Sequence, residues 1–435
     1  MTKPAIVSVS ASSIGCAKVG TSLRVDTILH TVIHLNNNLF QRAHAMHITL
    51  PHFLKPALAN GHPWVYRDHV PRHFSAPSGA WVEVQAGNWR GYALWDERSP
   101  IALRVYSQRR APDAAWLAQR VAAAWAVRQP LRQRGDNTAF RWLFGEGDGL
   151  PGLTVDLYND VAVVATYADS VETLLPWLCE ALRQTTPLRS ILHRTNDEES
   201  GALRGKVALL WGDWPSREFI VQEYGLRMRV DLYEGQKTGL FLDQRENRHW
   251  LAPHTAGKRL LNLFAYSGGF SLHAARAGAA QTTSVDIAPA AAEDAQRNFA
   301  LNGLDPAAHR FVVADVWDFL DEAQRHRERW EVVVCDPPSF ARNKGQLKQA
   351  IRAYTKLNAQ AMRATAPGGL YVASSCTSYV SPDAFRALLA DAARQAGRRF
   401  QLIHDAGHAL DHPVMAHHPE GRYLKFMVGH VPAMV

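Results

Sequence analysis

The C-terminal half of the chain alternates short, almost wholly apolar runs with longer segments in which apolar residues recur at helical spacing. The runs are RLLNLFA (259–265), TTSVDIA (282–288), HRFVVAD (309–315), EVVVCDPP (331–338), GGLYVASSC (368–376), FQLIHDA (400–406) and YLKFMVGH (423–430). Strands that are apolar on both faces are typical of parallel βαβ units, in which helices cover both sides of the sheet. The pattern predicts a doubly wound α/β domain over residues 219–435.

The N-terminal half has two further patterns. Residues 46–112 contain strand-like runs separated by glycine and proline, namely AWVEVQ (80–85), GYALWD (91–96) and IALRVY (101–106). They predict a small β domain. Residues 113–218 begin at helical spacing and end in the apolar run KVALLWG (206–212), which predicts a middle α/β domain.

Residues 1–45 have no sustained period, and we expect a disordered leader or an extension caused by the choice of start site. No apolar run reaches the roughly 20 residues of a membrane span. The N-terminus also lacks a continuous apolar segment behind a basic start, so we expect a cytoplasmic protein.

Composition adds two points. The four cysteines form no CxxC pair, which argues against a zinc knuckle and a disulfide framework, and no metal is predicted. The 48 Lys and Arg residues exceed the 40 Asp and Glu residues, for a formal charge of +8. This balance favours a polyanionic partner such as nucleic acid.

Candidate ligand-binding residues follow the predicted strands, because doubly wound sheets bind ligands beyond the carboxyl ends of their strands. The Gly268–Gly269 turn lets the backbone approach a ligand. Asp286 ends the next strand, where a carboxylate receives ribose hydroxyls, and Asp315 follows the third strand, within reach of an adenine amino group. Each aspartate has an alternative role as a helix N-cap. Since neither GxGxxG nor a P-loop is present, an adenosine ligand without pyrophosphate is favoured, and S-adenosylmethionine meets that description.

The fourth and fifth strands bring two more side chains to this edge. Pro337 and Pro338 hold the backbone of Asp336 extended, so its carboxylate can bind a planar base or orient a methyl donor. Cys335 should point to the opposite face and pack in the core. Cys376, in ASSCTSYV (373–380), follows the fifth strand and should lie beside Asp336 over the same cleft.

Seven segments together carry a family resemblance: GHPWVY (61–66), EGDGLPGLTVD (146–156), GQKTGLFLDQRENR (235–248), NLFAYSGGFSLHAA (262–275), DPPSFA (336–341), SSCTS (374–378) and DHPVMAHHPEGRYLK (411–425). From about residue 47 to its end, the chain resembles the RlmI-like class I methyltransferases, which make 5-methylcytosine in large-subunit ribosomal RNA. The resemblance implies a PUA-like RNA-binding domain, a middle α/β domain and a Rossmann-like methyltransferase domain. It also implies ribosomal RNA as the partner.

The resemblance further implies which residues contact S-adenosylmethionine. They are Asn262, Phe264, Tyr266, Gly268, Asp286, Asp315 and Asp336, with segment 235–248, including Arg245, covering the donor. The alternative for that segment is that Lys237 and Arg245 merely pair with Asp243 and Glu246.

Cytosine carbon 5 is a poor nucleophile, so an enzyme can add a thiolate to carbon 6 and push electron density onto carbon 5. We expect Cys376 to be this nucleophile, because four hydroxyl-bearing neighbours give its thiol a polar setting. Asp336 would bind the cytosine edge and, when protonated, stabilise the adduct. Two-cysteine RNA cytosine methyltransferases carry a second cysteine where this chain has Ser339, so the adduct must be released differently here.

Three alternatives stay open. Asp-Pro-Pro followed by an aromatic residue two positions on is also used to hold an exocyclic amine, so an amino-group methyltransferase is a rival. A non-catalytic RNA-binding factor in ribosome assembly is another. A metal at Asp411, His412, His417 and His418 is the third, but their spacing follows neither HExxH nor a zinc-knuckle pattern, which favours a structural or RNA-facing loop. The sequence leaves the modified nucleotide and a homodimer undecided.

Overall fold

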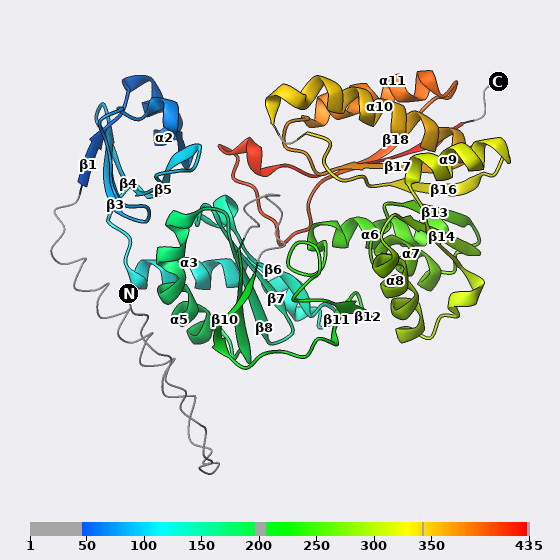
Figure 1. Cartoon of the computed structure of the whole chain (residues 1–435), viewed down its shortest axis with the longest axis horizontal. Coiled ribbons are helices and arrows are strands. Elements are labelled where there is room, and N and C mark those ends of the chain that lie inside the picture. Colours follow the sequence, from blue (N-terminus) through cyan, green and yellow to red (C-terminus); the bar gives the residue numbers. More distant parts are fainter. Residues whose placement is uncertain (1–45, 196–205, 342, 433–435) are drawn as a thin grey trace, which may run out of the picture. The chain divides into compact units, whose positions relative to one another are not determined.

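The computed structural model describes residues 46–195, 206–341 and 343–432 (Figure 1). The leader predicted for residues 1–45 lies outside the described residues. In the described part of the chain, no helix is both long and apolar enough to cross a membrane.

The N-terminal elements form a five-stranded sheet in the order β1-β3-β4-β5-β2, in which β3, β4, β5 and β2 pair antiparallel. Its strands are β1 (Met46–Thr49), β2 (Trp64–Tyr66), β3 (Trp81–Ala86), β4 (Trp89–Trp95) and β5 (Ile101–Ser107), with the short helix α2 (Lys55–Ala59). In β3 every second residue is buried, as expected for a strand with one face on the core. The three strands predicted from the N-terminal pattern are confirmed.

The middle elements form a second five-stranded sheet in the order β10-β9-β8-β7-β6. They are α3 (Ala114–Val127), α4 (Gln129–Gln133), β6 (Ala139–Phe144), β7 (Leu153–Tyr158), β8 (Val161–Thr166), α5 (Leu175–Thr185), β9 (Ser190–Arg194) and β10 (Val207–Gly212). The carboxylate of Asp113 caps α3 by accepting from the backbone N–H of Trp116, which is why the helix begins there. The predicted last strand is β10, at the sheet edge.

A hairpin leads to the C-terminal sheet, whose order is β15-β14-β13-β16-β17-β19-β18. The elements are β11 (Phe219–Glu223), β12 (Leu226–Val230), α6 (Arg245–Leu251), β13 (Arg259–Leu263), α7 (Gly269–Arg276), β14 (Gln281–Asp286), α8 (Pro289–Leu301), β15 (Arg310–Val313), α9 (Val316–Arg325), β16 (Trp330–Cys335), α10 (Leu347–Ala364), β17 (Thr365–Ser375), α11 (Pro382–Gln395), β18 (Gln401–Ala406) and β19 (Lys425–Val431). The first five strands are parallel, and β19 is antiparallel between its two neighbours. The strand order reverses between β13 and β16, and ligands bind at such a switch point.

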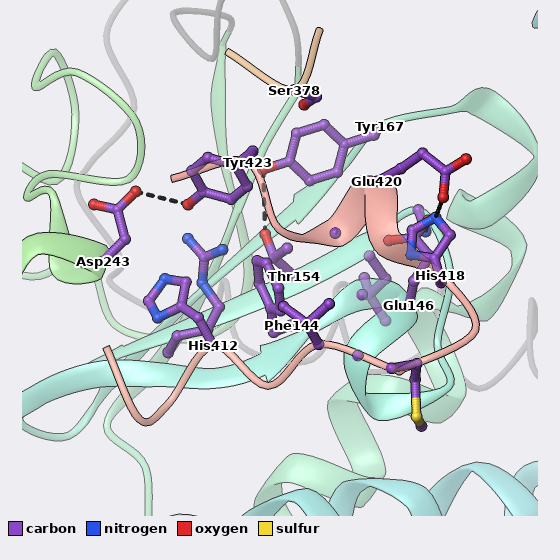
Figure 2. A pocket seen from close by; sticks show the side chains of 18 of the residues that line it. Phe144, Glu146, Thr154, Tyr167, Asp243, Ser378, His412, His418, Glu420 and Tyr423 are labelled. Carbon is purple, nitrogen blue, oxygen red and sulfur yellow. Dashed lines mark hydrogen bonds and ion pairs between the residues drawn. The ribbon is translucent and has the colours of Figure 1, made fainter. Parts of the chain in front are cut away.

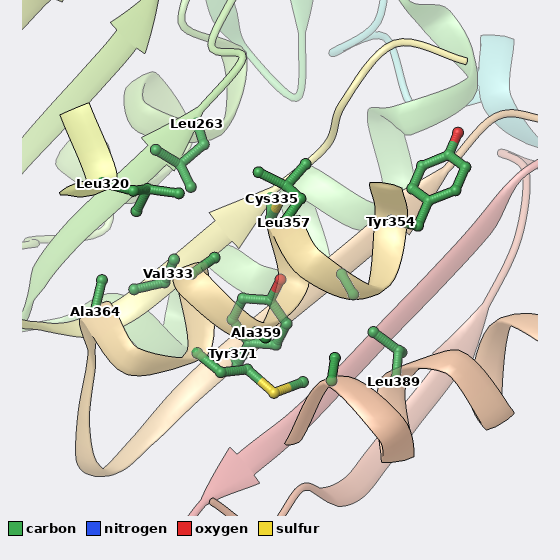
Figure 3. Close-up of a cluster of buried hydrophobic side chains, with 14 of the residues drawn as sticks. Leu263, Leu320, Val333, Cys335, Tyr354, Leu357, Ala359, Ala364, Tyr371 and Leu389 are labelled. Atoms are coloured by element: carbon green, nitrogen blue, oxygen red, sulfur yellow. The ribbon is translucent and has the colours of Figure 1, made fainter. Parts of the chain in front are cut away.

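Helices cover both faces of this sheet, as predicted. One face packs α9, α10 and α11 against alternate strand residues such as Val333 and Cys335 (Figure 3). The other face packs Leu251 of α6 and Phe270 of α7 against Val332 and Val334. The prediction that Cys335 packs in the core is therefore confirmed, since its side chain is fully buried.

Residues from His47 to the C-terminus form one unit by their contacts. The predicted boundaries after residues 112 and 218 stay predictions.

Candidate functional site

Two neighbouring hollows meet at Cys376. The first, here called the donor pocket, lies at the carboxyl ends of β13, β14 and β16 and includes Tyr266, Asp286 and Asp336. The second, here called the wide cleft, has a volume of about 680 Å³ and is shown in Figure 2. Cys376 lines both, together with Leu240, Phe241 and Asp243, so the two hollows adjoin at this residue.

The turn after β13 has an unusual backbone. Phe264 and Tyr266 have φ angles of 60° and 48°, and Gly268 follows at 77°. Left-handed backbone is costly for residues with a bulky side chain, and it persists at sites where the fold needs a particular shape. Here the turn directs Phe264 and Tyr266 into the donor pocket.

Asp286 is held at the end of β14 by two backbone donors. Its carboxylate accepts from the N–H of Tyr266 at 2.9 Å and from the N–H of Ala288 at 3.0 Å. The next residue, Ile287, lines the donor pocket with 69% of its surface exposed. An open apolar side chain beside a fixed carboxylate fits the adenine face and ribose hydroxyls of an adenosine ligand.

The structure brings only part of the predicted cofactor set to this pocket. Phe264, Tyr266, Asp286 and Asp336 line it, and Gly268 lies in the same turn. The remaining three, Asn262, Asp315 and Arg245, do not line it. The Asn262 amide is buried and donates to the Ser271 hydroxyl at 3.1 Å, while exposed Asp315 caps α9.

Arg245 lies away from both hollows, fully buried. Its guanidinium donates to Asp411 at 2.9 Å and to Glu246 at 3.0 Å. Asp411 also accepts from the backbone N–H of Arg141 at 2.7 Å, so this carboxylate joins α6 to the middle sheet. Of the two pairings weighed from sequence for Arg245, the one with Glu246 is present. Its contact with the donor stays a prediction.

Replacing Arg245 with methionine is expected to lower the free energy of unfolding by about 3–5 kcal/mol, because Asp411 would keep a buried charge without its main partner. Arg297→Met is the matched control, since that arginine makes an exposed pair with Glu293 at 3.7 Å and such pairs contribute about 0–1 kcal/mol. Urea unfolding followed by circular dichroism measures both. Equal losses in the two variants would contradict a structural role for the buried pair.

Asp336 is tied to segment 235–248 through Gln244. The Gln244 amide donates to the Asp336 carboxylate at 3.0 Å and to the Ser374 hydroxyl at 2.9 Å. Burial raises the pKa of Asp336 to about 6, with a further rise from the charge of Asp243, while hydrogen bonds from Ser374 and Gln244 oppose the shift. The carboxyl can therefore gain and lose a proton near neutral pH.

Cys376 is the most accessible of the cysteines in the described residues, since Cys179 and Cys335 are buried. Burial raises the pKa of its thiol, and the positive charges of Lys237 and Lys425 act in the opposite direction. A thiol in this setting is largely protonated until a substrate or base assists its ionisation.

Lys425 is the residue that sequence reasoning missed most clearly. It is fully buried at the start of β19, opposite Ser375 in the strand ladder. Its ammonium donates to the carbonyls of Thr377 and, at 2.7 Å, Tyr423, and burial lowers its pKa to about 8. It thus holds the backbone directly after Cys376. Its place at the end of segment 411–425 was the available signal.

Arg248 was also missed, although it closes segment 235–248. It lines the donor pocket, and its guanidinium is fixed by Glu223 of the hairpin through contacts of 2.7 and 2.6 Å. A Cβ on Gly269 would meet the Arg248 side chain at 2.8 Å, so this glycine leaves room for the arginine beside the turn.

The histidines of segment 411–425 separate in the structure. His412 pairs with Asp411 at 2.8 Å. His418 instead lies near His62 and Glu420, and the ligand atoms of these three residues fall within 4.8 Å of one another. Glu420 is 3.7 Å from His62 and 3.8 Å from His418, as in ordinary histidine–carboxylate pairs. The metal group considered from sequence is therefore not assembled from its predicted members.

Comparison with known proteins agrees with this geometry. A family model for S-adenosylmethionine-dependent methyltransferases matches residues 150–408, and one for a PUA-like domain matches residues 48–108. The crystal structure of SMU.776 in complex with SAH superposes with a TM-score of 0.79 at 24% identity, covering 89% of this chain and 100% of that one. This likeness shows the fold.

Curated relatives cover most of the chain. Ribosomal RNA large subunit methyltransferase I of Shewanella denitrificans is 37% identical over 390 residues, which are 87% of this chain and 98% of the relative. The protein of that name from Aeromonas salmonicida is 35% identical over 379 residues, 86% of this chain and 96% of the relative. The ribosomal RNA large subunit methyltransferase of Deinococcus radiodurans is 38% identical over 385 residues, with shares of 85% and 93%.

A PUA-like domain together with a Rossmann-like sheet that matches the methyltransferase family model defines an S-adenosylmethionine-dependent methyltransferase. More particularly, the chain belongs to the family of the ribosomal RNA large subunit methyltransferase I proteins. The fold class, the family and the cofactor expected from sequence are confirmed.

Replacing Asp286 with alanine is expected to weaken S-adenosylmethionine binding about 10- to 100-fold, because hydrogen bonds to a charged group are worth about 1.5–3 kcal/mol. Isothermal titration calorimetry measures the change. Asp318→Ala is the control, since Asp318 is exposed in the first turn of α9 and lines neither hollow. Unchanged affinity in Asp286→Ala would remove this carboxylate from the donor site.

Proposed function

We propose that the chain methylates carbon 5 of a cytosine in large-subunit ribosomal RNA through a covalent adduct with Cys376. The observation that carries the proposal is that Cys376, the one cysteine among the residues that line either hollow, lines both the donor pocket and the wide cleft. A nucleophile placed there can hold a base from the cleft against the donor. The substrate follows the names of the relatives, which are ribosomal RNA large subunit methyltransferases.

In the proposed reaction the Cys376 thiolate forms a bond to carbon 6 of cytosine. The electrons of the carbon 5–carbon 6 double bond move toward carbon 5 and the ring, and carbon 5 becomes nucleophilic. S-adenosylmethionine, when bound, would supply the electrophilic methyl group, whose new bond to carbon 5 replaces its bond to the sulfonium sulfur. The carbon-5 proton then leaves to water or to a base of the cleft. Its bonding electrons restore the double bond and expel the thiolate, so no oxidant or reductant is needed.

Asp336 is proposed to bind the cytosine edge, to protonate ring nitrogen 3 as the thiolate adds, and to take that proton back as the thiolate leaves. Its raised pKa of about 6 suits a group that must carry a proton for part of the cycle. Gln244 fixes the carboxylate in place. Lys237 and Lys425 are proposed to favour the thiolate by their charge.

Donor contacts are proposed for Phe264, Tyr266, Asp286 and Asp336, which line the donor pocket. Gly268 is proposed to give the turn its shape. The resemblance alone supports donor contacts by Asn262, Arg245 and Asp315.

The position of Phe340 gives little support to the alternative of an amino-group methyltransferase. An enzyme that holds an exocyclic amine needs an aromatic ring against the target base, but Phe340 packs on Tyr354 with ring centroids 4.6 Å apart. It lines neither the donor pocket nor the wide cleft. The non-catalytic rival would not need a thiol at the junction of the two hollows. A cytoplasmic location stays part of the proposal, and a homodimer stays open.

The deciding experiment incubates the protein with isotopically labelled S-adenosylmethionine and ribosomal RNA from cells that lack this chain. The RNA is digested to nucleosides, and the methylated product is identified by mass spectrometry against standards. Label in 5-methylcytidine supports the proposal. Label on an amine would overturn the covalent mechanism, and binding of RNA without any transfer would favour the assembly factor.

A further inference from the structure

The wide cleft is bordered by three exposed tyrosines from three different sheets. Tyr66 ends β2 of the N-terminal sheet, Tyr167 follows β8 of the middle sheet, and Tyr379 follows β17 of the C-terminal sheet. Their exposed fractions are 41%, 42% and 40%. Large side chains left this open are uncommon away from binding surfaces when they gather around one hollow.

Two of the three tyrosines contact a neighbouring side chain, and all three line the cleft. Trp64 packs edge-on against Tyr66, with centroids 6.4 Å apart and an interplanar angle of 82°. In Figure 2 the Tyr167 ring extends over Thr154, with 3.5 Å between the two side-chain oxygens. Tyr379 stands three residues after Cys376 in the chain. The rings therefore border the space next to the proposed nucleophile.

The wide cleft is lined by one lysine, Lys237, and by three carboxylates, those of Glu146, Asp243 and Glu420, so its charges favour bases over phosphates. Its two arginines are engaged with buried carboxylates, Arg141 with Asp156 at 2.5 Å and Arg104 with Asp96 at 3.8 Å. Glu420 adds negative charge at the cleft wall. Phosphate groups need free cations, whereas aromatic rings offer stacking surfaces to any unpaired base.

We propose that Tyr66, Tyr167 and Tyr379 form a stacking subsite for unpaired bases that flank the target nucleotide. The inference rests on the proposed RNA substrate and adds which residues hold the strand. A base that enters the cleft must leave its stack, and neighbouring bases lose stacking energy with it. The three tyrosine rings would replace that lost stacking. Each of the three domains would contribute one ring to the subsite.

The test uses the full chain and a 12-nucleotide single-stranded RNA with one central cytidine and 2-aminopurine beside it. Stacking on a ring quenches 2-aminopurine fluorescence. Tyr66→Leu, Tyr167→Leu and Tyr379→Leu are each expected to weaken binding about tenfold, in line with the cost of losing one base–aromatic stack. At least one of them should also lose the quench. The matching phenylalanine variants should bind like the wild type, because they keep the ring.

Phe53→Leu is the control, since Phe53 is 64% exposed and lies outside the cleft. S-adenosylmethionine affinity, measured by calorimetry, should stay the same in all variants. If the wild type binds the RNA with quenching and the leucine variants do the same, the stacking subsite is wrong while the proposed function stands. If the wild type binds neither this RNA nor ribosomal RNA, the proposed function itself fails.

Discussion

Replacing Cys376 with serine is expected to lower the rate of methyl transfer by about a thousandfold or more, because a serine hydroxyl cannot replace a thiolate as the attacking nucleophile. S-adenosylmethionine affinity should change little, since the proposed adduct forms with the base and not with the donor. Single-turnover transfer of labelled methyl groups to ribosomal RNA measures the rate, and calorimetry measures the affinity.

A trapping experiment sharpens this prediction. In RNA that carries 5-fluorocytosine at the target position, the fluorine cannot leave as a proton does, so the thioether to carbon 6 should persist. The wild type is expected to form a denaturant-resistant RNA–protein band that Cys376→Ser does not form. Cys179→Ala is the control, because Cys179 is buried in the middle-domain core and should leave the band intact. Full activity in Cys376→Ser would support the amino-group rival.

Replacing Asp336 with asparagine is expected to lower kcat/KM about 10²- to 10⁴-fold, which is the usual contribution of a positioned acid or base. Asparagine keeps the size of the side chain and an oxygen for the Gln244 donor, but it cannot deliver a proton. The loss should therefore appear in the rate more than in S-adenosylmethionine affinity.

The pH profile gives this variant a signature that a merely structural role would not produce. The active wild-type form holds one proton on Asp336 and none on Cys376. Below the Asp336 pKa of about 6 both groups are protonated, so kcat/KM should fall there. It should also fall above the raised pKa of the thiol. In Asp336→Asn the plot of kcat/KM against pH should show no transition near pH 6. Instead, kcat/KM should rise with pH until the thiol is ionised.

Stability provides the folding control for Asp336→Asn. The carboxyl pKa rises from 3.8 to about 6 on folding, so the folded state binds the proton more tightly and stability falls as pH rises through that window. Above that pH window the buried carboxylate is ionised, and its burial lowers the free energy of unfolding by the full amount. Asparagine carries no charge, so at pH 8 the variant is expected to unfold at no lower temperature than the wild type. If Asp336→Asn were markedly destabilised, its loss of activity would be explained by unfolding of the protein and not by loss of the acid.

Several features were within reach of the sequence because they depend on local pattern. The seven strands of the C-terminal sheet followed from apolar runs, and burial of Cys335 followed from strand alternation. Asp286 and Asp336 were placed correctly at strand ends, since parallel strands bring their carboxyl ends to one edge. The charge balance of the sequence indicated only that a polyanionic partner is favoured.

Other features depended on contacts between distant segments, which no local pattern records. The ion pair of Arg245 with Asp411 is an example, since Asp411 lies 166 residues further along the chain. The group of His62, His418 and Glu420 joins two ends of the chain in the same way.

The sequence by itself determined the fold class, the cofactor and the residue types at the strand ends, because periodicity and motif spacing act within a few residues. Only the tertiary structure decided that Cys376 stands where the donor pocket and the wide cleft meet, that Lys425 lies behind it, and that three tyrosines border the cleft. These arrangements arise when separate sheets and loops pack together. They result from the burial of side chains and the pairing of charges between segments that lie far apart in the sequence.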